Sequence, residues 1–462
     1  MGDYLKALEF YERSHKILEK SLPSNHPSLA TSYNNIGSVY ASMGHYSKTL
    51  EFYDKALKID EKSLPPNHPV LATSYNNIGG VYYNVGDYSK ALEFYEKALK
   101  IRDNALPSNH PLLATSYNNI AAVYNNMGNY SKALEFYEKA HKIFEKALPS
   151  NHPLLATSYN NIGQVYNDMG NYSKALEFYE KSHKIFEKAL PSNHPLLATS
   201  YNNIAAVYND MGNYSKALEF LEKSHKIFEK ALPPNHPSLA TSYNNIGAVY
   251  NNMGVYSETL EFCEKAHQIF EKALPPNHPN LATSYGNIGL VYKNMGDYSK
   301  ALEVNEKALK IREKALPPNH PDLATSYNSI GAVYDDMGDY SKALELYEKS
   351  HKIFEKALPP NHPYLAVSYN NIGLAYNNMG DYSKALEFYE KALKIEEKAL
   401  PPNHPNLATS YGNIGQLYNN MGNHSKALSF LEKALAIQQK TLPPSHPHVK
   451  ETIRRSNNVK KV

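Results

Sequence analysis

A 42-residue period runs through almost the whole chain. The dipeptide His-Pro recurs at this spacing eleven times, with its prolines at Pro27, Pro69, Pro111, Pro153, Pro195, Pro237, Pro279, Pro321, Pro363, Pro405 and Pro447. Self-similarity with a period of about 20 to 50 residues is typical of proteins in which one supersecondary unit stacks on copies of itself. Such stacking produces a long repeated surface, and an enclosed catalytic pocket is not its natural product.

Each period predicts two helices. In repeat 1, which starts at Pro27, proline suits the first turn of a helix, where a missing backbone N–H is no loss. Gly44 ends this helix, here called helix A, and a second helix, helix B, begins near Tyr46. The prolines at 65 and 66 break helix B. Apolar residues recur along both helices at the spacing of one helical face, and no strand signal competes. The sequence therefore predicts an all-α chain of antiparallel helix pairs.

Composition excludes several classes of function. The net charge is only +3, which gives no electrostatic case for nucleic acid or a membrane surface as partner. Cys263, the single cysteine, stands where other repeats have tyrosine, and we expect a small buried substitute rather than a reactive thiol. No apolar run of about 18 residues and no signal-peptide core occur, so we expect a cytoplasmic protein. Phosphate-loop, dinucleotide and metalloprotease motifs are also missing, so we expect no enzyme activity and no cofactor.

The 20 histidines invite a metal site. Eleven of them precede the repeated prolines, and we expect each to serve as a helix cap or loop-packing group. Neighbouring copies would lie about a helix width of ~10 Å apart, too far to share an ion bound at ~2 Å. The sequence therefore predicts no metal site.

The conserved spacing within one period resembles that of the tetratricopeptide repeat, with tyrosine in place of its usual tryptophan. The residues that carry the resemblance are Tyr33, Ile36, Gly37, Tyr40, Gly44, Tyr46, Thr49 (Ala91 in the next repeat), Tyr53 and Ala56. The longer 42-residue form resembles the repeats of kinesin light chains and nephrocystin-like proteins. The resemblance implies a right-handed α-solenoid of ten full repeats, with a half repeat before them, a capping helix after them, and helices A lining a concave peptide-binding channel.

By that geometry, an asparagine pair and several variable positions of helix A face the channel. The candidate peptide-binding residues are Asn34, Asn35, Asn76, Asn77, Asn118, Asn119, Asn160, Asn161, Gln164, Asp168, Asn202, Asn203, Asp210, Asn244, Asn245, Asn287, Lys293, Asn328, Asp335, Asn370, Asn371, Asn413 and Gln416. An asparagine side chain both donates and accepts hydrogen bonds, so a ladder of them suits an extended backbone in either sense. The alternative is that the asparagines bond to one another or to adjacent helices.

The charges at these positions narrow the class of partner. A terminal-carboxylate clamp of the chaperone-binding kind would need Lys or Arg where Thr31 and the asparagine pair stand, so we exclude that ligand. Acidic cargo of the kinesin-light-chain kind needs a basic groove, whereas here Lys293 alone opposes four carboxylates, those of Asp168, Asp210, Asp335 and Asp336. We expect a neutral to mildly basic protein or peptide segment as ligand, bound by a monomer.

Helix B alternates between two residue pairs. Where one position is histidine, as at His141, the residue three later is apolar, as at Phe144. Where it is leucine, as at Leu99, the later residue is polar, as at Arg102. Residues three apart are neighbours on a helix, so we interpret the pair as placing one apolar group over the same patch from either side. This predicts two structural subtypes of repeat.

The ends of the chain lie outside the regular repeats. We expect an orphan helix B at residues 1–26, ten repeats at 27–446, and a capping helix with a basic tail at 447–462. Met1 aligns with Met43, which lies in the turn between the two helices of repeat 1. We therefore expect the chain to be a piece of a longer protein. The leading functional hypothesis is a non-enzymatic scaffold. The alternatives are a kinesin-light-chain-like cargo adaptor and the regulatory or sensor region of a larger signalling protein.

Overall fold

The computed structural model describes residues 3–460, which form 22 α-helices and no strand within that range. An N-terminal helix, α1 (Asp3–Ser21), precedes ten A/B pairs, and α22 (Pro447–Lys460) follows them. Helices A are α2 (Pro27–Ser42), α4 (Pro69–Asn84), α6 (Pro111–Asn126), α8 (Pro153–Asp168), α10 (Pro195–Asp210), α12 (Pro237–Met253), α14 (Pro279–Asn294), α16 (Pro321–Asp336), α18 (Pro363–Asn378) and α20 (Pro405–Asn420). Helices B are α3 (Tyr46–Ser63), α5 (Tyr88–Ala105), α7 (Tyr130–Ala147), α9 (Tyr172–Ala189), α11 (Tyr214–Ala231), α13 (Tyr256–Ala273), α15 (Tyr298–Ala315), α17 (Tyr340–Ala357), α19 (Tyr382–Ala399) and α21 (His424–Thr441).

The repeated histidine caps helix A. In repeat 1 the backbone N–H of Ser28 donates to Nδ1 of His26 at 3.2 Å, and the corresponding histidine of each later repeat accepts in the same way. This contact satisfies one of the free N–H groups at the start of the helix. The predicted capping role of the loop histidines is confirmed.

Small residues on helix A make room for helix B of the same repeat. A Cβ atom on Gly37 would lie 2.6 Å from the ring of Tyr53, so only glycine admits the ring at this distance. In repeat 6 the smaller Cys263 takes the place of the tyrosine and is 4% exposed. Burial raises the pKa of its thiol to about 11, and the thiol is therefore protonated and unreactive at neutral pH. The expectation of a small buried substitute is confirmed.

The two predicted subtypes exist, but the physical reason differs from our interpretation. A buried serine of helix A, such as Ser158 or Ser116, needs a hydrogen-bond partner from helix B of the preceding repeat. In one subtype Nδ1 of His141 lies 2.7 Å from Oγ of Ser158. In the other, Nη1 of Arg102 donates to Oγ of Ser116 at 2.8 Å. In both subtypes helix B supplies a polar partner for the buried serine, from either of two positions three residues apart. The position that does not supply the partner carries the apolar residue.

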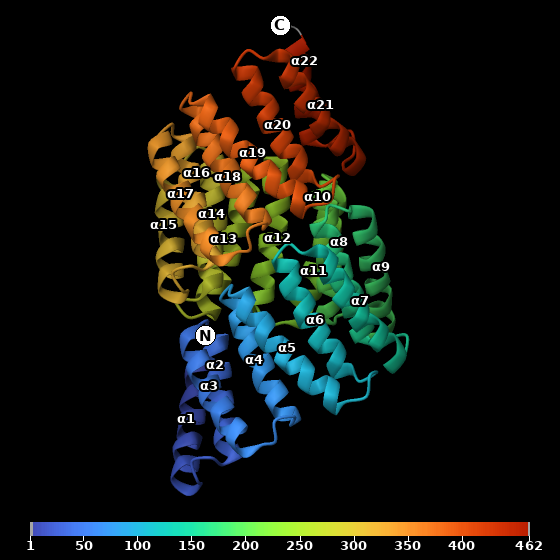
Figure 1. The fold of residues 1–462 in the computed structure, drawn as a ribbon, viewed down its shortest axis with the longest axis vertical. Coiled ribbons are helices and arrows are strands. Elements are labelled where there is room, and N and C mark those ends of the chain that lie inside the picture. The colour runs from blue at the N-terminus through green and yellow to red at the C-terminus, as the bar shows by residue number, and fades with distance from the viewer. Residues whose placement is uncertain (1–2, 461–462) are drawn as a thin grey trace.

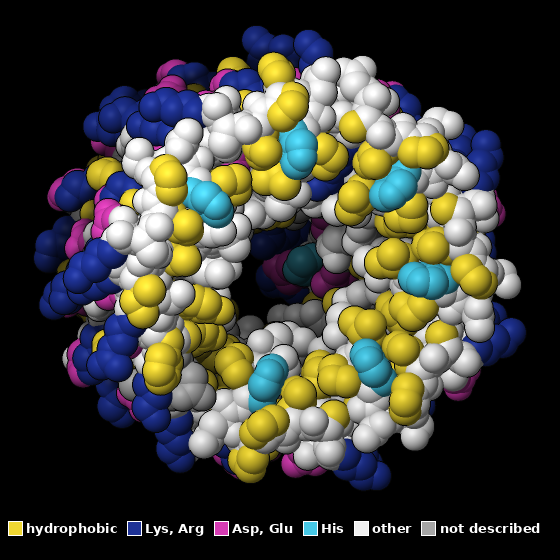
Figure 2. All heavy atoms as spheres, turned by 90° about the horizontal axis from the view of Figure 1, so that it is seen from below, with side chains coloured by type: hydrophobic (Ala, Val, Ile, Leu, Met, Phe, Trp, Pro, Cys, Tyr) yellow, Lys and Arg dark blue, Asp and Glu magenta, His cyan; other side chains and the backbone are white. Residues whose placement is uncertain are grey.

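The helix pairs coil into a right-handed spiral with helices A on the inside (Figure 1). Side chains of neighbouring helices A hydrogen-bond directly across the repeat boundaries, as expected for the layer with the smaller radius. Seen from below, the repeats surround a central opening, and Lys and Arg side chains gather on the outer circumference (Figure 2). Histidine and apolar side chains are spaced around the lower rim in the same view.

Successive turns of the spiral touch along a line that we call the seam. There the N-terminus of a helix A meets the C-terminus of the helix A six repeats earlier, as α16 meets α4 and α18 meets α6. Nε2 of His320 donates to the carbonyl oxygen of Asn84 at 2.9 Å, and Nε2 of His362 donates to that of Asn126 at 2.6 Å. The same histidine thus caps its own helix through Nδ1 and binds the lower helix through Nε2. The two helix dipoles are aligned head to tail, which is favourable.

The C-terminal helix α22 packs on α20 and α21 and buries Val449 and Val459. The helix continues to Lys460, so the described part of the expected basic tail is helical. Lys461 and Val462, the end of that expected tail, lie outside the described residues, as do Met1 and Gly2.

Candidate functional site: the inner wall of the spiral

One stripe of each helix A faces the inside of the spiral. In repeat 1 the stripe consists of Thr31, Ser38 and Ser42, which are exposed, with Asn35 half-buried between them. Residues at these positions on three successive helices, such as Leu290, Thr325 and Val367, line a single hollow. They therefore share one concave surface, which we call the inner wall.

The predicted binding residues all lie on helices A. Both asparagines of each pair are half-buried, and Gln164 and Asp210 are exposed. Nδ2 of Asn119 donates to Oδ1 of Asn76 at 2.6 Å, so the second asparagine of one repeat leans on the first asparagine of the repeat before it. The other first asparagines, seven in all, have a buried Oδ1 with no hydrogen-bond partner in the described protein; they are Asn34, Asn118, Asn160, Asn202, Asn244, Asn328 and Asn370. These oxygens retain the capacity to accept a hydrogen bond.

A second ladder of side chains lies about two turns further along helices A. Its members pair across every boundary from repeat 2 to repeat 10, always between residues 43 positions apart. The residue types at these positions vary from repeat to repeat, but each residue faces a partner with which it can hydrogen-bond. Examples are Asn125 with Asp168 (2.7 Å) and Lys293 with Asp336 (2.9 Å). The remaining pairs are Tyr83–Asn126, Asn167–Asp210, Asn209–Asn252, Asn251–Asn294, Asp335–Asn378 and Asn377–Asn420.

The ladders give the inner wall a negative character. Lys293 forms an ion pair with Asp336, whereas Asp168, Asp210 and Asp335 accept hydrogen bonds from neutral amides. The surrounding inner wall desolvates all three carboxyl groups, including that of Asp210, which is exposed on its open side. This desolvation raises their pKa, and the amide hydrogen bonds oppose that shift. The wall thus carries carboxylates with amide partners, which a cationic guest group would stabilise.

The inner wall also contains an apolar hollow that the sequence did not reveal as a site. Its volume is about 340 Å³, and it lies where Gly286 and Ser329 replace asparagines of the pair. Exposed Leu290 and Val367 line it. The signal was present in the sequence, because leucine and valine stand at positions that are small or polar in most other repeats.

Known protein families were compared with the chain, and the family found agrees with this repeat architecture. The tetratricopeptide repeat family matches in nine overlapping segments, 1–62, 46–104, 112–188, 154–230, 196–258, 238–314, 294–356, 322–398 and 364–440. The chain belongs to the tetratricopeptide repeat family. No curated protein matches the chain.

Several solved structures are similar. TPR-like repeats of Podosopora anserina that carry the kinesin light chain name are 28% identical, covering 44% of this chain and 97% of that one with a TM-score of 0.38. BtubC (BKLC) from P. vanneervenii is 21% identical, with coverages of 51% and 96% and a TM-score of 0.42. A Rap protein complexed with competence and sporulation factor is 16% identical, with coverages of 81% and 99% and a TM-score of 0.52. The Rap likeness concerns the fold alone.

Two other kinds of site find no support in residues 3–460. No group of three or more His, Cys, Asp or Glu side chains in this range is arranged to hold a metal ion. None of the described helices has the length and apolar character to cross a bilayer.

Proposed function

We propose that this protein is a non-enzymatic scaffold that binds an extended protein segment along the inner wall. The observation that carries the proposal is the continuous inner stripe, which repeats the same amide groups on successive helices A around a central opening. Binding surfaces of solenoid proteins are concave and extended in the same way.

The spacing of the amides suits an extended guest. Contacting helices lie about 8 to 10 Å apart, and an extended chain advances about 3.3 Å per residue. A guest would therefore cross one repeat about every three residues and meet an asparagine pair in each repeat except 7, 8 and 10, which keep one asparagine of the pair. Half-buried groups such as Asn161 and Asn203 can bond to peptide N–H or C=O groups without selecting a side chain.

Charge and shape would add selectivity. The carboxylates of Asp168, Asp210 and Asp335 disfavour an acidic guest and favour a neutral to mildly basic one. The hollow beside Leu290 and Val367 would receive an apolar side chain of the guest. A cargo adaptor and a sensor region of a larger signalling protein are narrower forms of this proposal, since both would use the same wall.

A peptide library tests the proposal without a known partner. Random 12-residue peptides displayed on phage are selected on the immobilised protein, and enriched sequences are synthesised with a fluorescent label. Binding is then measured by anisotropy for the wild type and for the variant N119A/N161A/N203A. We expect the variant to bind at least ten-fold more weakly.

The matched control carries the same number of substitutions on the outside. Glu135, Glu177 and Glu219 are exposed on helices B, where each forms an ion pair with a lysine four residues later. Such surface pairs contribute little to stability. The variant E135A/E177A/E219A should bind like the wild type. If no peptide is enriched, or if the outer variant weakens binding as much as the inner one, the proposal is wrong.

A further inference from the structure

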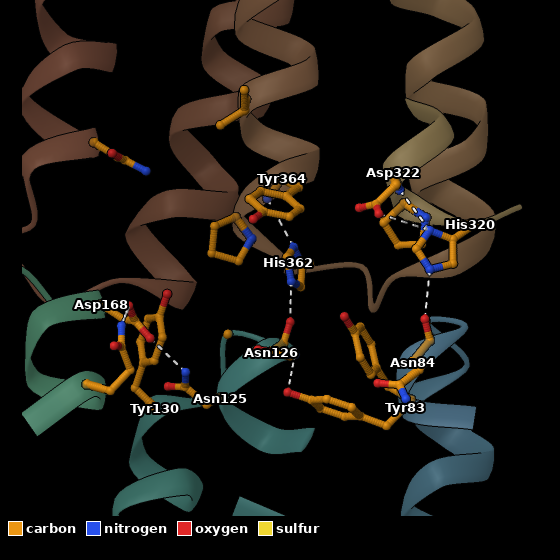
Figure 3. Close-up of a pocket in the computed structure, with 18 of the residues that line it drawn as sticks. Tyr83, Asn84, Asn125, Asn126, Tyr130, Asp168, His320, Asp322, His362 and Tyr364 are labelled. Carbon is orange, nitrogen blue, oxygen red and sulfur yellow. Dashed lines mark hydrogen bonds and ion pairs between the residues drawn. The ribbon is translucent and has the colours of Figure 1, made fainter. Parts of the chain in front are cut away.

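The seam encloses a pocket that no single repeat could form. Its volume is about 690 Å³, and its walls come from both turns of the spiral. Tyr130 and Asp168 of the lower turn lie across it from Asp322 and Tyr364 of the upper turn (Figure 3). Gln164, exposed on the inner wall, also lines it, so the pocket borders the surface proposed to bind a guest.

The pocket holds negative charge without a cation. Asp168 and Asp322 line it, and no Lys or Arg is among its described lining residues. Asp168 accepts hydrogen bonds at 2.7 Å from the neutral amides of Asn125 and Gln164. Arg312 does not line the pocket, but it donates to the backbone oxygen of Asp322 at 3.1 Å and its charge interacts with the Asp322 carboxyl from outside the pocket.

The histidines of the pocket do not supply a positive charge. In His320, Nδ1 accepts the backbone N–H of Asp322 at 3.0 Å while Nε2 donates to the oxygen of Asn84. This pattern requires the neutral ring with its proton on Nε2. The 4.0 Å separation between this Nδ1 and Oδ2 of Asp322 is therefore not an ion pair. His362 makes the same two contacts.

Four tyrosines also line the pocket, namely Tyr83, Tyr88, Tyr130 and Tyr364. Burial, then Asp322 and Asp168, raises the pKa of Tyr364, so both carboxylates act on this one hydroxyl. Burial is also the main cause that raises the pKa of Tyr88 to about 12, and Asp322 contributes. Phenol groups beside carboxylates combine aromatic surface with acceptor oxygens, an arrangement that suits an organic cation.

The sequence departs from the repeat pattern where the two turns converge. The residue after the conserved proline is apolar or serine in repeats 1 to 6, as in Leu112 and Leu154. In repeats 7 to 10, whose helices A begin above the first turn, it is Asn280, Asp322, Tyr364 or Asn406, and the last three line the pocket. Polar residues thus replace apolar ones at the copies that approach the lower turn.

We propose that the seam pocket binds a guanidinium or alkylammonium group against Tyr364, with the carboxylate of Asp168 on one side and that of Asp322 on the other (Figure 3). The inference goes beyond the proposed function, since a small cation could occupy the pocket without a guest segment on the inner wall. The group could belong to a free metabolite or to an Arg or Lys side chain of a guest.

The test uses N-acetyl-arginine amide and its neutral isostere N-acetyl-citrulline amide, with binding to the full chain measured by saturation-transfer NMR. We expect a dissociation constant on the order of 1 mM for the arginine compound and no measurable binding of the citrulline compound. The variant D168N/D322N should bind the arginine compound at least ten-fold more weakly. Both substitutions copy residues that the chain uses at the same positions, Asn126 and Asn280, so folding should be retained.

The control variant D339N/D381N removes two carboxylates that cap helices B and do not line the pocket, and it copies Asn129 and Asn171 at the same repeat position. It should bind the arginine compound like the wild type. Equal binding of both compounds, absence of binding to the wild type, or equal losses in the two variants would each overturn the proposal.

A second pair of probes distinguishes the sources of the cation. Agmatine represents a free metabolite, and the peptide acetyl-Gly-Ser-Arg-Ser-Gly-amide represents a guest segment. Tighter binding of the peptide to the wild type, lost in D168N/D322N, would assign the pocket to a guest side chain. Equal binding of agmatine, with the same loss, would assign it to a small molecule. Retention of either probe by D168N/D322N would contradict the site.

Discussion

A single methyl group in the seam should destabilise the protein more than the same methyl group elsewhere. Gly128 has φ +71°, and a Cβ atom there would lie 2.7 Å from Cδ of Pro363. Gly296 stands at the same position of a later repeat, has φ +82°, and has nothing within 4 Å of such an atom. Both G128A and G296A carry the cost of a left-handed alanine, about 1 to 2 kcal/mol. Only G128A adds an overpacked contact, about 1 to 3 kcal/mol more.

Urea unfolding and hydrogen-exchange mass spectrometry measure this difference. Because repeat arrays can unfold in parts, exchange of the segment 125–130 is followed together with the global midpoint. We expect G128A to lose roughly 1 to 3 kcal/mol more than G296A and to exchange faster around Asn126 and His362, whose 2.6 Å hydrogen bond crosses the seam. Equal stabilities within about 0.5 kcal/mol, with unchanged exchange at 125–130, would refute the seam as a stabilising contact.

Two further predictions concern buried polar groups. Nδ1 of His183 lies 2.8 Å from Oγ of Ser200, so H183L should lower the free energy of unfolding by about 1 to 2 kcal/mol. Adding F186R, so that the pair copies Leu99 and Arg102, should restore much of this loss. If the losses of the two substitutions add in urea unfolding, the exchange of polar partners is wrong. Burial raises the pKa of Glu396 from 4.5 to about 7. The protonated side chain therefore makes its full contribution to the free energy of unfolding below about pH 4.5, and this contribution is lost as the pH rises through 7. The free energy of unfolding of E396Q should therefore exceed that of the wild type by up to about 3 kcal/mol at pH 8.5 and by little at pH 4. A difference that does not change with pH would show that the carboxyl is not buried as described.

The helices could be predicted from the sequence because their signals are local. Proline at helix starts, glycine after helix ends and the apolar spacing place Pro27–Ser42 and Tyr46–Ser63 where the structure has them. The alternation on helix B was also visible, but its meaning was not. Nothing in the sequence marks Ser158 as the buried group that requires either a histidine or a polar residue three positions later.

The seam could not be predicted, because it depends on a small rotation between repeats accumulated over six of them. No local pattern links Asn84 to His320, which are 236 residues apart. Once the seam is known, the polar residues at Asp322 and Tyr364 become intelligible as its lining. The assignment of the asparagines to peptide binding remains a prediction, since the structure fixes their position on the inner wall and not their ligand.

The most direct test of the central claim is where a bound guest touches the protein. A peptide enriched on the wild type is synthesised with benzoylphenylalanine at successive positions, irradiated in complex, and its cross-links are located by mass spectrometry. We predict cross-links to inner-stripe residues such as Ser38, Ala122 and Gln164, which advance by one repeat about every three peptide positions. Cross-links on the outer faces of helices B would contradict the account.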